Sequence, residues 1–380
     1  MFTLNRSLTV LKSARTCFFL LGFAIAAWAP LVPYIQKDLS LSKVELSLMI
    51  LTMGLGSIIG MLTATFIVKV KGTRFAVFVS GTVLCLALIA VAARFNFFLQ
   101  FFCVLVYGFA MGCMEVAVNL YGSFLEKKFK APLLSGFHGF YSIGQIFAVL
   151  IISLFLTVNF SPLYATAIPS LVVLGTLILA SFALDSEKIV SDEPFFVLPK
   201  GFVIMLALIA LSALTAEGAM IDWTGLLLIE KEAADPQTAA SGYLTVVVFM
   251  AVGRFSGSMV LKHVGAFLTL LISVIIAAAA LMLVSLNKDP AVIYAALAAL
   301  GLSLANILPL AVSYAGRQKY MPQTAAVAAV STCGYAAITF GPALIGSIGT
   351  LFSLSGAFAV MGIWLLLLAA GIFLAKKAFN

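Results

Sequence analysis

Long apolar segments recur along the whole chain, and they restrict it to a structure built inside a lipid bilayer. The chain has 380 residues, of which 63% are hydrophobic and only 9% are charged. A helix needs roughly 20 apolar residues to cross the hydrocarbon core, where its backbone polar groups must be satisfied internally. An all-α membrane protein with twelve transmembrane helices is therefore predicted, at residues 15–36, 46–68, 75–93, 97–125, 133–158, 163–184, 201–229, 240–261, 266–286, 290–315, 324–350 and 354–375.

The positive charges are distributed unequally between the two sides of the predicted membrane. With a cytoplasmic N-terminus, 16 of the 22 lysines and arginines fall in cytoplasmic segments and 5 fall on the other side, while Arg254 lies within a predicted helix. An excess of this sign is the positive-inside pattern of membrane proteins. Both termini are therefore predicted to be cytoplasmic, and the net charge of +8 is attributed to topology and not to nucleic-acid binding.

Two sequence correspondences indicate an internal repeat. Gly60 and Gly72 are 12 residues apart, and Gly253 and Gly265 repeat that spacing at an offset of 193 residues. A polar loop ending in proline recurs at an offset of 190 and aligns residue 144 with residue 334, both glycine. Such repeats are typical of secondary transporters. Two pseudo-symmetric six-helix halves are predicted, at 1–184 and 201–380, joined by a polar cytoplasmic linker at 185–200.

With its twelve helices, two halves and the short basic loop at 69–74, the chain resembles the major facilitator superfamily. That loop pattern usually has an aspartate where Lys69 stands. Within the superfamily, the chain resembles the fucose–proton symporter branch and related bacterial inner-membrane carriers. The segments that carry this resemblance are 112–119, 216–223, 253–255 and 301–309.

The resemblance implies a monomeric bacterial inner-membrane carrier that works by alternating access. It also implies a proton-coupling role for Glu115 and a polar contact to the solute for Asn119. The branch has an aspartate in its first helix where Ala29 stands here, so the resemblance does not identify fucose as the substrate.

Glu115 also stands out from the residues alone. A charged side chain at the bilayer centre costs about 2.5–3.5 kcal/mol, so its retention indicates a role in a substrate or proton pathway. The alternative is a protonated, hydrogen-bonded glutamate that joins helices. Glu217 is the second deep acid, and both are predicted to couple protons.

Further polar and aromatic side chains lie within the predicted helices. His138 and Arg254 are assigned to gating, and Arg254 is placed about 10 Å from Glu217 along the membrane normal by helical rise. The same groups are also suited to helix–helix hydrogen bonding, worth about 0.6 kcal/mol each. The residues predicted to bind substrate are Trp28, Asn119, Tyr141, Gln145, Asp222, Asn306 and Tyr335.

The motifs that would indicate another function are missing from the sequence. It has no phosphate-binding Gly-x-x-x-x-Gly-Lys-[Ser/Thr] loop and no His-Glu-x-x-His, so no enzyme, metal or cofactor is predicted, and a proton gradient is the expected driving force. The predicted function is proton-coupled symport of a small polar solute, a sugar or sugar-like metabolite. The predicted partners are that solute, protons and the lipid bilayer. The alternatives are proton-antiport efflux of amphipathic compounds and a non-transporting membrane sensor.

Overall fold

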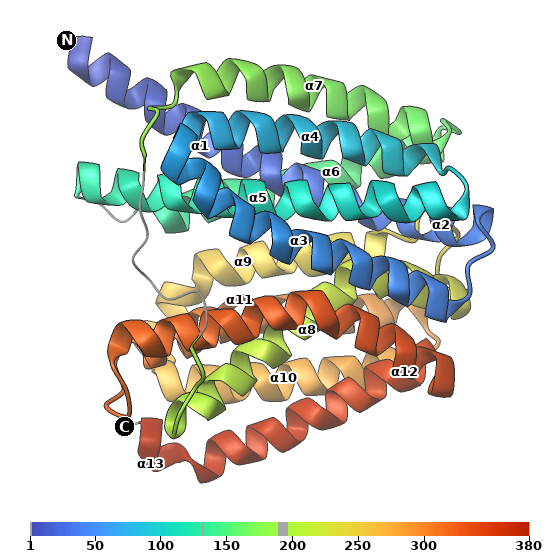
Figure 1. The fold of residues 1–380 in the computed structure, drawn as a ribbon. Helices are drawn as coiled ribbons and strands as arrows, with labels where there is room; N and C mark the ends of the chain where they lie inside the picture. The colour runs from blue at the N-terminus through green and yellow to red at the C-terminus, as the bar shows by residue number, and fades with distance from the viewer. Residues whose placement is uncertain (1, 131–132, 189–196, 380) are drawn as a thin grey trace. The chain divides into compact units, whose positions relative to one another are not determined.

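A computed structural model describes residues 2–130, 133–188 and 197–379, and the elements within these ranges are helical (Figure 1). The N-terminal elements are α1 (Phe2–Ala26), the 3₁₀ helix η1 (Ala29–Leu31), α2 (Val32–Asp38), α3 (Lys43–Lys71), α4 (Thr73–Ala93), α5 (Phe97–Phe129), α6 (Leu134–Thr157) and α7 (Pro162–Ala183). The C-terminal elements are α8 (Phe202–Glu230), α9 (Ser241–Val264), α10 (Ala266–Leu286), α11 (Pro290–Ala315), α12 (Gln323–Leu374) and α13 (Lys376–Phe379).

The chain forms two compact units. The first comprises Met1–Ser42 and Leu48–Ser191, and the second comprises Lys43–Ser47 and Asp192–Asn380. Within the described ranges, ten helices are long and apolar enough to cross a membrane, and α9 adds a shorter apolar segment. Ser353 interrupts α12 with a non-helical φ of 78°. Counting α12 as two passes and including α9 gives the twelve helices predicted from the sequence.

The first predicted helix is broken near its end. The sequence predicts a single span at 15–36, but α1 begins at Phe2 and ends at Ala26. Pro30 lies in η1, and Pro33 lies in the first turn of α2. Proline lacks an amide hydrogen and favours the first turn of a helix, so each proline starts a new short element.

The internal repeat is visible in the backbone of the two tight turns. Gly72 joins α3 to α4 with φ 86° and ψ 166°, and Gly265 joins α9 to α10 with φ 83° and ψ 157°. L-amino acids rarely adopt such positive φ values, whereas glycine adopts them without a side-chain clash. The 193-residue offset found in the sequence therefore relates two turns of the same geometry.

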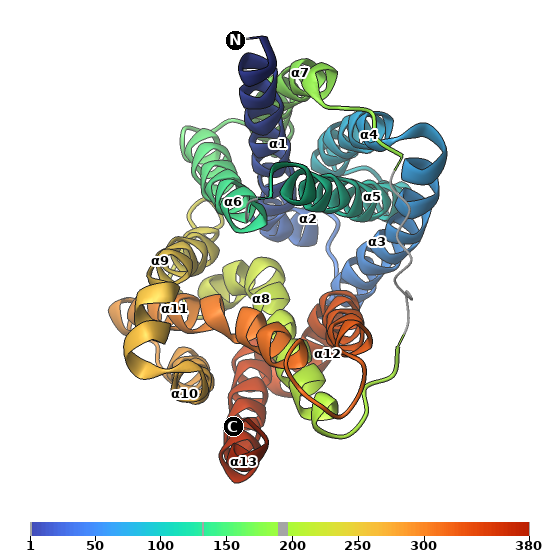
Figure 2. The same ribbon diagram turned by 90° about the vertical axis from the view of Figure 1, so that its left-hand side faces the viewer.

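Helix packing repeats in the same way. Gly60 of α3 packs directly on the backbone of α5 at Phe109, and Gly253 of α9 packs on α11 at Leu302. Gly144 of α6 packs on the backbone of α1, and its counterpart Gly334 in α12 packs on α8. In Figure 2, α12 and α11 both lie beside α8 within the C-terminal unit. Small residues permit this close approach of membrane helices.

The beginning of the predicted linker is bound to the N-terminal unit. Asp185 forms an ion pair with Lys128 at 2.7 Å, and its backbone amide donates to the Tyr121 hydroxyl at 3.0 Å. The Thr73 hydroxyl donates to the Asp185 carbonyl at 3.0 Å, and the Arg74 guanidinium donates to the Leu184 carbonyl. The basic loop after α3 therefore holds the end of α7 in place.

In the C-terminal unit, a lysine hydrogen-bonds the connection after α8 to the connection after α10. Lys231, which follows α8, donates from Nζ to the carbonyls of Ser285 and Asn287 at 2.8 Å each. Burial, and after it the nearby charge of Lys288, lowers the pKa of Lys231. These bonds satisfy carbonyls at the end of α10 that have no partner within the helix.

Candidate functional site

In the N-terminal unit, Asn119 connects α5 to α6 beside Glu115. Its Nδ2 donates to the Glu115 backbone carbonyl at 2.9 Å, and its Oδ1 lies 3.2 Å from Nε2 of His138. Glu115 and Asn119 are half-buried, one helical turn apart on α5. The sequence predicted this shared face from their spacing of four residues. The contact with His138, 19 residues away in the chain, is established by the structure.

The contact between Asn119 and His138 fixes which imidazole nitrogen carries a proton. The Asn119 amide points its NH₂ group at the Glu115 carbonyl, so its oxygen is the atom that faces the ring. An amide oxygen can only accept a hydrogen bond. Nε2 of His138 is therefore the donor, and the ring is protonated at that atom.

Four polar side chains form a stripe along one face of α6, at His138, Tyr141, Ser142 and Gln145. The Ser142 hydroxyl donates to the His138 carbonyl at 3.2 Å, and Gln145 Nε2 donates to the Tyr141 hydroxyl at 3.5 Å. Ser142 and Gln145 are 2% and 3% exposed, whereas Tyr141 is half-buried and His138 is exposed. The stripe is therefore buried at Ser142 and Gln145 and open to its surroundings at His138.

Trp28 lies in the interior of the N-terminal unit. It is 1% exposed and stacks on Tyr107, with ring centroids 6.4 Å apart. The Tyr107 hydroxyl donates to the Ala24 carbonyl at 2.7 Å, where the end of α1 leaves carbonyls without helical partners. No role is predicted for Tyr107 from the sequence. What the sequence does offer is an aromatic residue with a polar hydroxyl inside a predicted spanning helix, and such a hydroxyl needs a hydrogen-bond partner when it is buried.

In the C-terminal unit, Glu217 of α8 and Arg254 of α9 form an ion pair. Arg254 Nη2 lies 3.8 Å from Glu217 Oε1, and both side chains are about one-third exposed. The separation of about 10 Å from helical rise predicts no direct pair, and this prediction is wrong. Helical rise locates Cα atoms only, whereas the long arginine side chain spans much of the remaining distance.

The pairing predicts a non-additive mutational response. Glu217→Gln alone or Arg254→Gln alone is expected to cost roughly 1 kcal/mol of stability, because the ion pair is lost at a place where both side chains are about one-third exposed. The Glu217→Gln/Arg254→Gln double variant should lose no more than either single variant. Thermal unfolding of the three variants in detergent measures this, and additive losses in the double variant would contradict the pairing.

Two other residues of the C-terminal unit that are predicted to bind substrate, Asp222 and Asn306, lie on different helices. Asp222 of α8 is 3% exposed, and Asn306 of α11 donates from Nδ2 to the Gly253 carbonyl of α9 at 3.3 Å. The side chain of Tyr335 lies outside the described part of the structure. Asn306 thus joins helices in this conformation, which is the role that the sequence analysis left open beside substrate binding.

A tryptophan contact in this unit was not predicted. Trp223 is fully buried, and its Nε1 donates to the Pro342 carbonyl at 2.8 Å. Gly346 packs against the same indole ring. The bond fixes α8 against α12 next to its proline. Trp223 was noted in the sequence only as part of a resemblance, without a role.

Across the described ranges, no three histidine, cysteine, aspartate or glutamate side chains are grouped so as to hold a metal ion. The five cysteines are free thiols, and four of them are buried. The chemistry that the described residues support is hydrogen bonding and charge pairing by the groups above.

Comparison with known sequences agrees with this architecture. A family model for the Major Facilitator Superfamily matches residues 16–322. An uncharacterised MFS-type transporter of Yersinia pestis is 33% identical over 362 residues, covering 94% of each chain. The membrane protein MosC of Rhizobium meliloti is 26% identical over 90% of this chain and 84% of its own length.

Solved structures show the same fold. The nucleoside transporter NupG superposes with a TM-score of 0.71 at 14% identity, covering 98% of this chain and 99% of its own. A bacterial homologue of the human lysosomal transporter Spinster, inward-facing and occupied, superposes with a TM-score of 0.73 at 13% identity, covering 97% and 96%. The family match over most of the chain and the relative at 33% identity lead to one conclusion: this chain belongs to the major facilitator superfamily of membrane transporters.

Proposed function

We propose that this transporter couples the movement of a small polar solute, a sugar or sugar-like metabolite, to protons moving in the same direction. The observation that carries the proposal is the cluster of Glu115, Asn119 and His138 within membrane-spanning helices. A carboxyl and an imidazole beside a fixed amide combine two groups that exchange protons with a hydrogen-bonding scaffold. Ionisable residues in spanning helices most often mark such pathways.

Glu115 is the proposed proton site. The carboxylate is costly in a low-dielectric environment, and protonation removes that charge. We assign the neutral form to the carrier that reorients and the charged form to the carrier that releases its proton. Asn119, Tyr141 and Gln145 would contribute the amide and hydroxyl groups that suit a polyol, alongside Trp28, Asp222, Asn306 and Tyr335.

Glu217 is the proposed second titrating group, and its pairing with Arg254 supports that role. Protonation of Glu217 would end the 3.8 Å ion pair with Arg254. Binding of a proton would in this way change the contact between α8 and α9, so a change in charge would alter how the two helices pack. Arg254 and His138 keep their proposed gating roles in this scheme.

The setting of the carrier is also proposed. The charge bias of the loops supports a bacterial inner-membrane protein with both termini in the cytoplasm. A functional monomer is proposed because membership of the major facilitator superfamily implies it. Neither the name of the nucleoside transporter nor that of the Spinster homologue assigns a substrate here, because identity of 13–14% supports the fold alone.

Solute-dependent proton movement in proteoliposomes tests the proposal. Purified protein would be reconstituted with a pH-sensitive dye inside, and hexoses, deoxyhexoses, polyols and small metabolites would be added outside in turn. Internal acidification by one solute, absent from protein-free liposomes, is the expected result. Alkalinisation would instead establish antiport and favour efflux. Solute uptake that is unaffected by an uncoupler would overturn proton coupling.

A further inference from the structure

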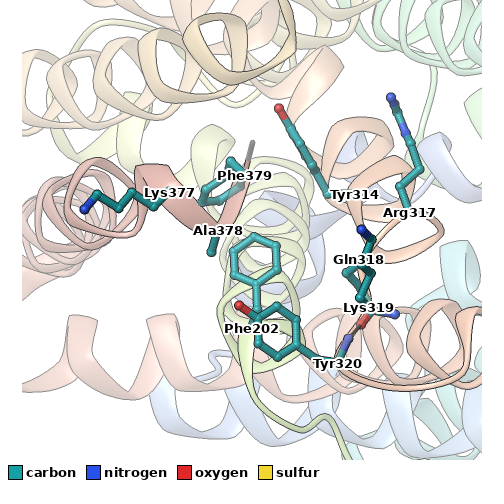
Figure 3. A pocket seen from close by; sticks show the side chains of 9 residues that line it. All are labelled: Phe202, Tyr314, Arg317, Gln318, Lys319, Tyr320, Lys377, Ala378 and Phe379. Atoms are coloured by element: carbon teal, nitrogen blue, oxygen red, sulfur yellow. Dashed lines mark hydrogen bonds between the residues drawn. The ribbon is translucent and has the colours of Figure 1, made fainter.

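Outside the cluster described above, one end of the C-terminal unit contains a hollow of about 430 Å³ (Figure 3). Three separate elements line it: Phe202 at the start of α8, the connection between α11 and α12, and α13 near the end of the chain. In the topology proposed above from the loop charges, this end is on the cytoplasmic side. The hollow is therefore located where spanning helices end and lipid head groups begin.

Aromatic rings form the floor of the hollow. The Phe379 ring lies 4.7 Å from that of Phe202 and 5.0 Å from that of Tyr314, edge-on in both cases. Tyr320 packs against Phe202 with centroids 5.9 Å apart. Edge-on contacts of this kind are favourable for aromatic pairs, so the floor is a packed surface. Aromatic residues at this depth are typical of the membrane interface.

The rim of the hollow is positively charged. Arg317, Lys319 and Lys377 line it, and no carboxylate side chain is among its described lining residues. Figure 3 shows Arg317 and Lys377 on opposite sides of the aromatic floor. All three side chains are exposed. Because like charges repel, this arrangement favours an anionic occupant between them.

The wall that bears two of these charges is held in shape by a buried amide. Gln318 is 9% exposed, and its Nε2 donates to the Met321 carbonyl at 2.9 Å. Its Oε1 accepts from the backbone amides of Tyr320 and Met321 at 2.6 and 3.0 Å. Arg317 donates from Nε to the Ser313 carbonyl at 3.2 Å. The connection is therefore ordered by its own side chains.

We propose that this hollow binds the phosphate-bearing head group of an anionic phospholipid. Arginine and lysine around it supply charge and hydrogen bonds for phosphate, and basic pockets between spanning helices favour lipid head groups. The aromatic floor, formed at the start of α8, near the end of α11, in the connection that follows it and in α13, favours a lipid over a soluble phosphate ester. The glycerol portion of a lipid can rest on apolar rings that a free phosphate ion would not use.

Native mass spectrometry of the delipidated full-length protein tests the proposal. Phosphatidylglycerol and phosphatidylcholine would be added separately, and the bound lipid counted. One phosphatidylglycerol should remain bound under conditions that remove phosphatidylcholine. Arg317→Gln/Lys319→Gln/Lys377→Gln should weaken its retention by roughly 10- to 100-fold.

A matched variant separates a specific site from general charge. Lys71, Lys127 and Lys262 are exposed and lie outside the hollow, so replacing all three by glutamine changes the net charge equally. This control should retain phosphatidylglycerol within about twofold of the unaltered protein. Equal weakening by both variants would overturn the site.

Two readouts do not depend on the stability of the triple variant. Adding glycerol 3-phosphate or inorganic phosphate to the unaltered protein should not displace the lipid at comparable concentrations, and full displacement would show a soluble phosphate site instead. Equal retention of phosphatidylglycerol and phosphatidylcholine by the unaltered protein would also contradict the proposal.

Discussion

Proton-driven accumulation of solute is expected to fall to background in Glu115→Gln, while solute exchange across the same membrane continues. Glutamine keeps the size and hydrogen-bonding capacity of a protonated carboxyl but cannot release a proton. The Asn119 bond goes to the backbone carbonyl of residue 115, so the substitution leaves it in place. Uptake and counterflow of the identified solute in proteoliposomes, with and without a pH gradient, measure the two activities.

Glu126 on the same helix is a matched control. It lies near the end of α5 and accepts a hydrogen bond from the Leu134 amide at 2.9 Å, which a glutamine oxygen can also accept. Glu126→Gln should keep pH-driven accumulation near that of the unaltered protein. Full accumulation in Glu115→Gln would remove Glu115 from the coupling mechanism.

Gly108→Ala is expected to destabilise the protein strongly, although it adds only a single methyl group. A Cβ at position 108 would overlap the carbonyl oxygen and Cα of Met53, because α5 packs there directly on the backbone of α3. Overpacking typically costs about 1–3 kcal/mol, and backbone atoms cannot rotate away as a side chain can. A loss of roughly 3 kcal/mol is expected, with a melting temperature lower by on the order of 10 °C, which thermal unfolding in detergent measures.

Gly175→Ala separates packing from the intrinsic effect of removing a glycine. Gly175 lies within α7, and a Cβ there would meet no atom within 4 Å. Alanine favours a helix over glycine by about 1 kcal/mol, so this variant should be as stable as the unaltered protein or more so. Equal destabilisation by the two substitutions would show that the α3–α5 contact is not the cause.

The architecture could be read from the sequence because two of its physical causes are local. Apolar length predicts a spanning helix without knowledge of its neighbours, and positive φ at Gly72 and Gly265 is a property of individual residues. Even the division between the last two spans was found, since the predicted gap at 351–353 contains Ser353, where the helix changes direction.

The polar contacts could be predicted less well, because they depend on how helices tilt and rotate against each other. The face shared by Glu115 and Asn119 follows from helical periodicity, but the approach of His138 requires the packing of α6 on α5. For Glu217 and Arg254, a one-dimensional distance along the membrane normal gave the wrong answer. Side-chain reach and helix orientation decide such pairs.

Because Nε2 of His138 donates to Asn119, the charge of the imidazole ring can change without any movement of the ring. A second proton can be added only at Nδ1, since Nε2 already carries one and points it at Asn119. The neutral and cationic forms of the ring therefore make the same bond. Protonation of His138 would change the local electrostatic potential, while the hydrogen bond that joins α5 to α6 stayed in place.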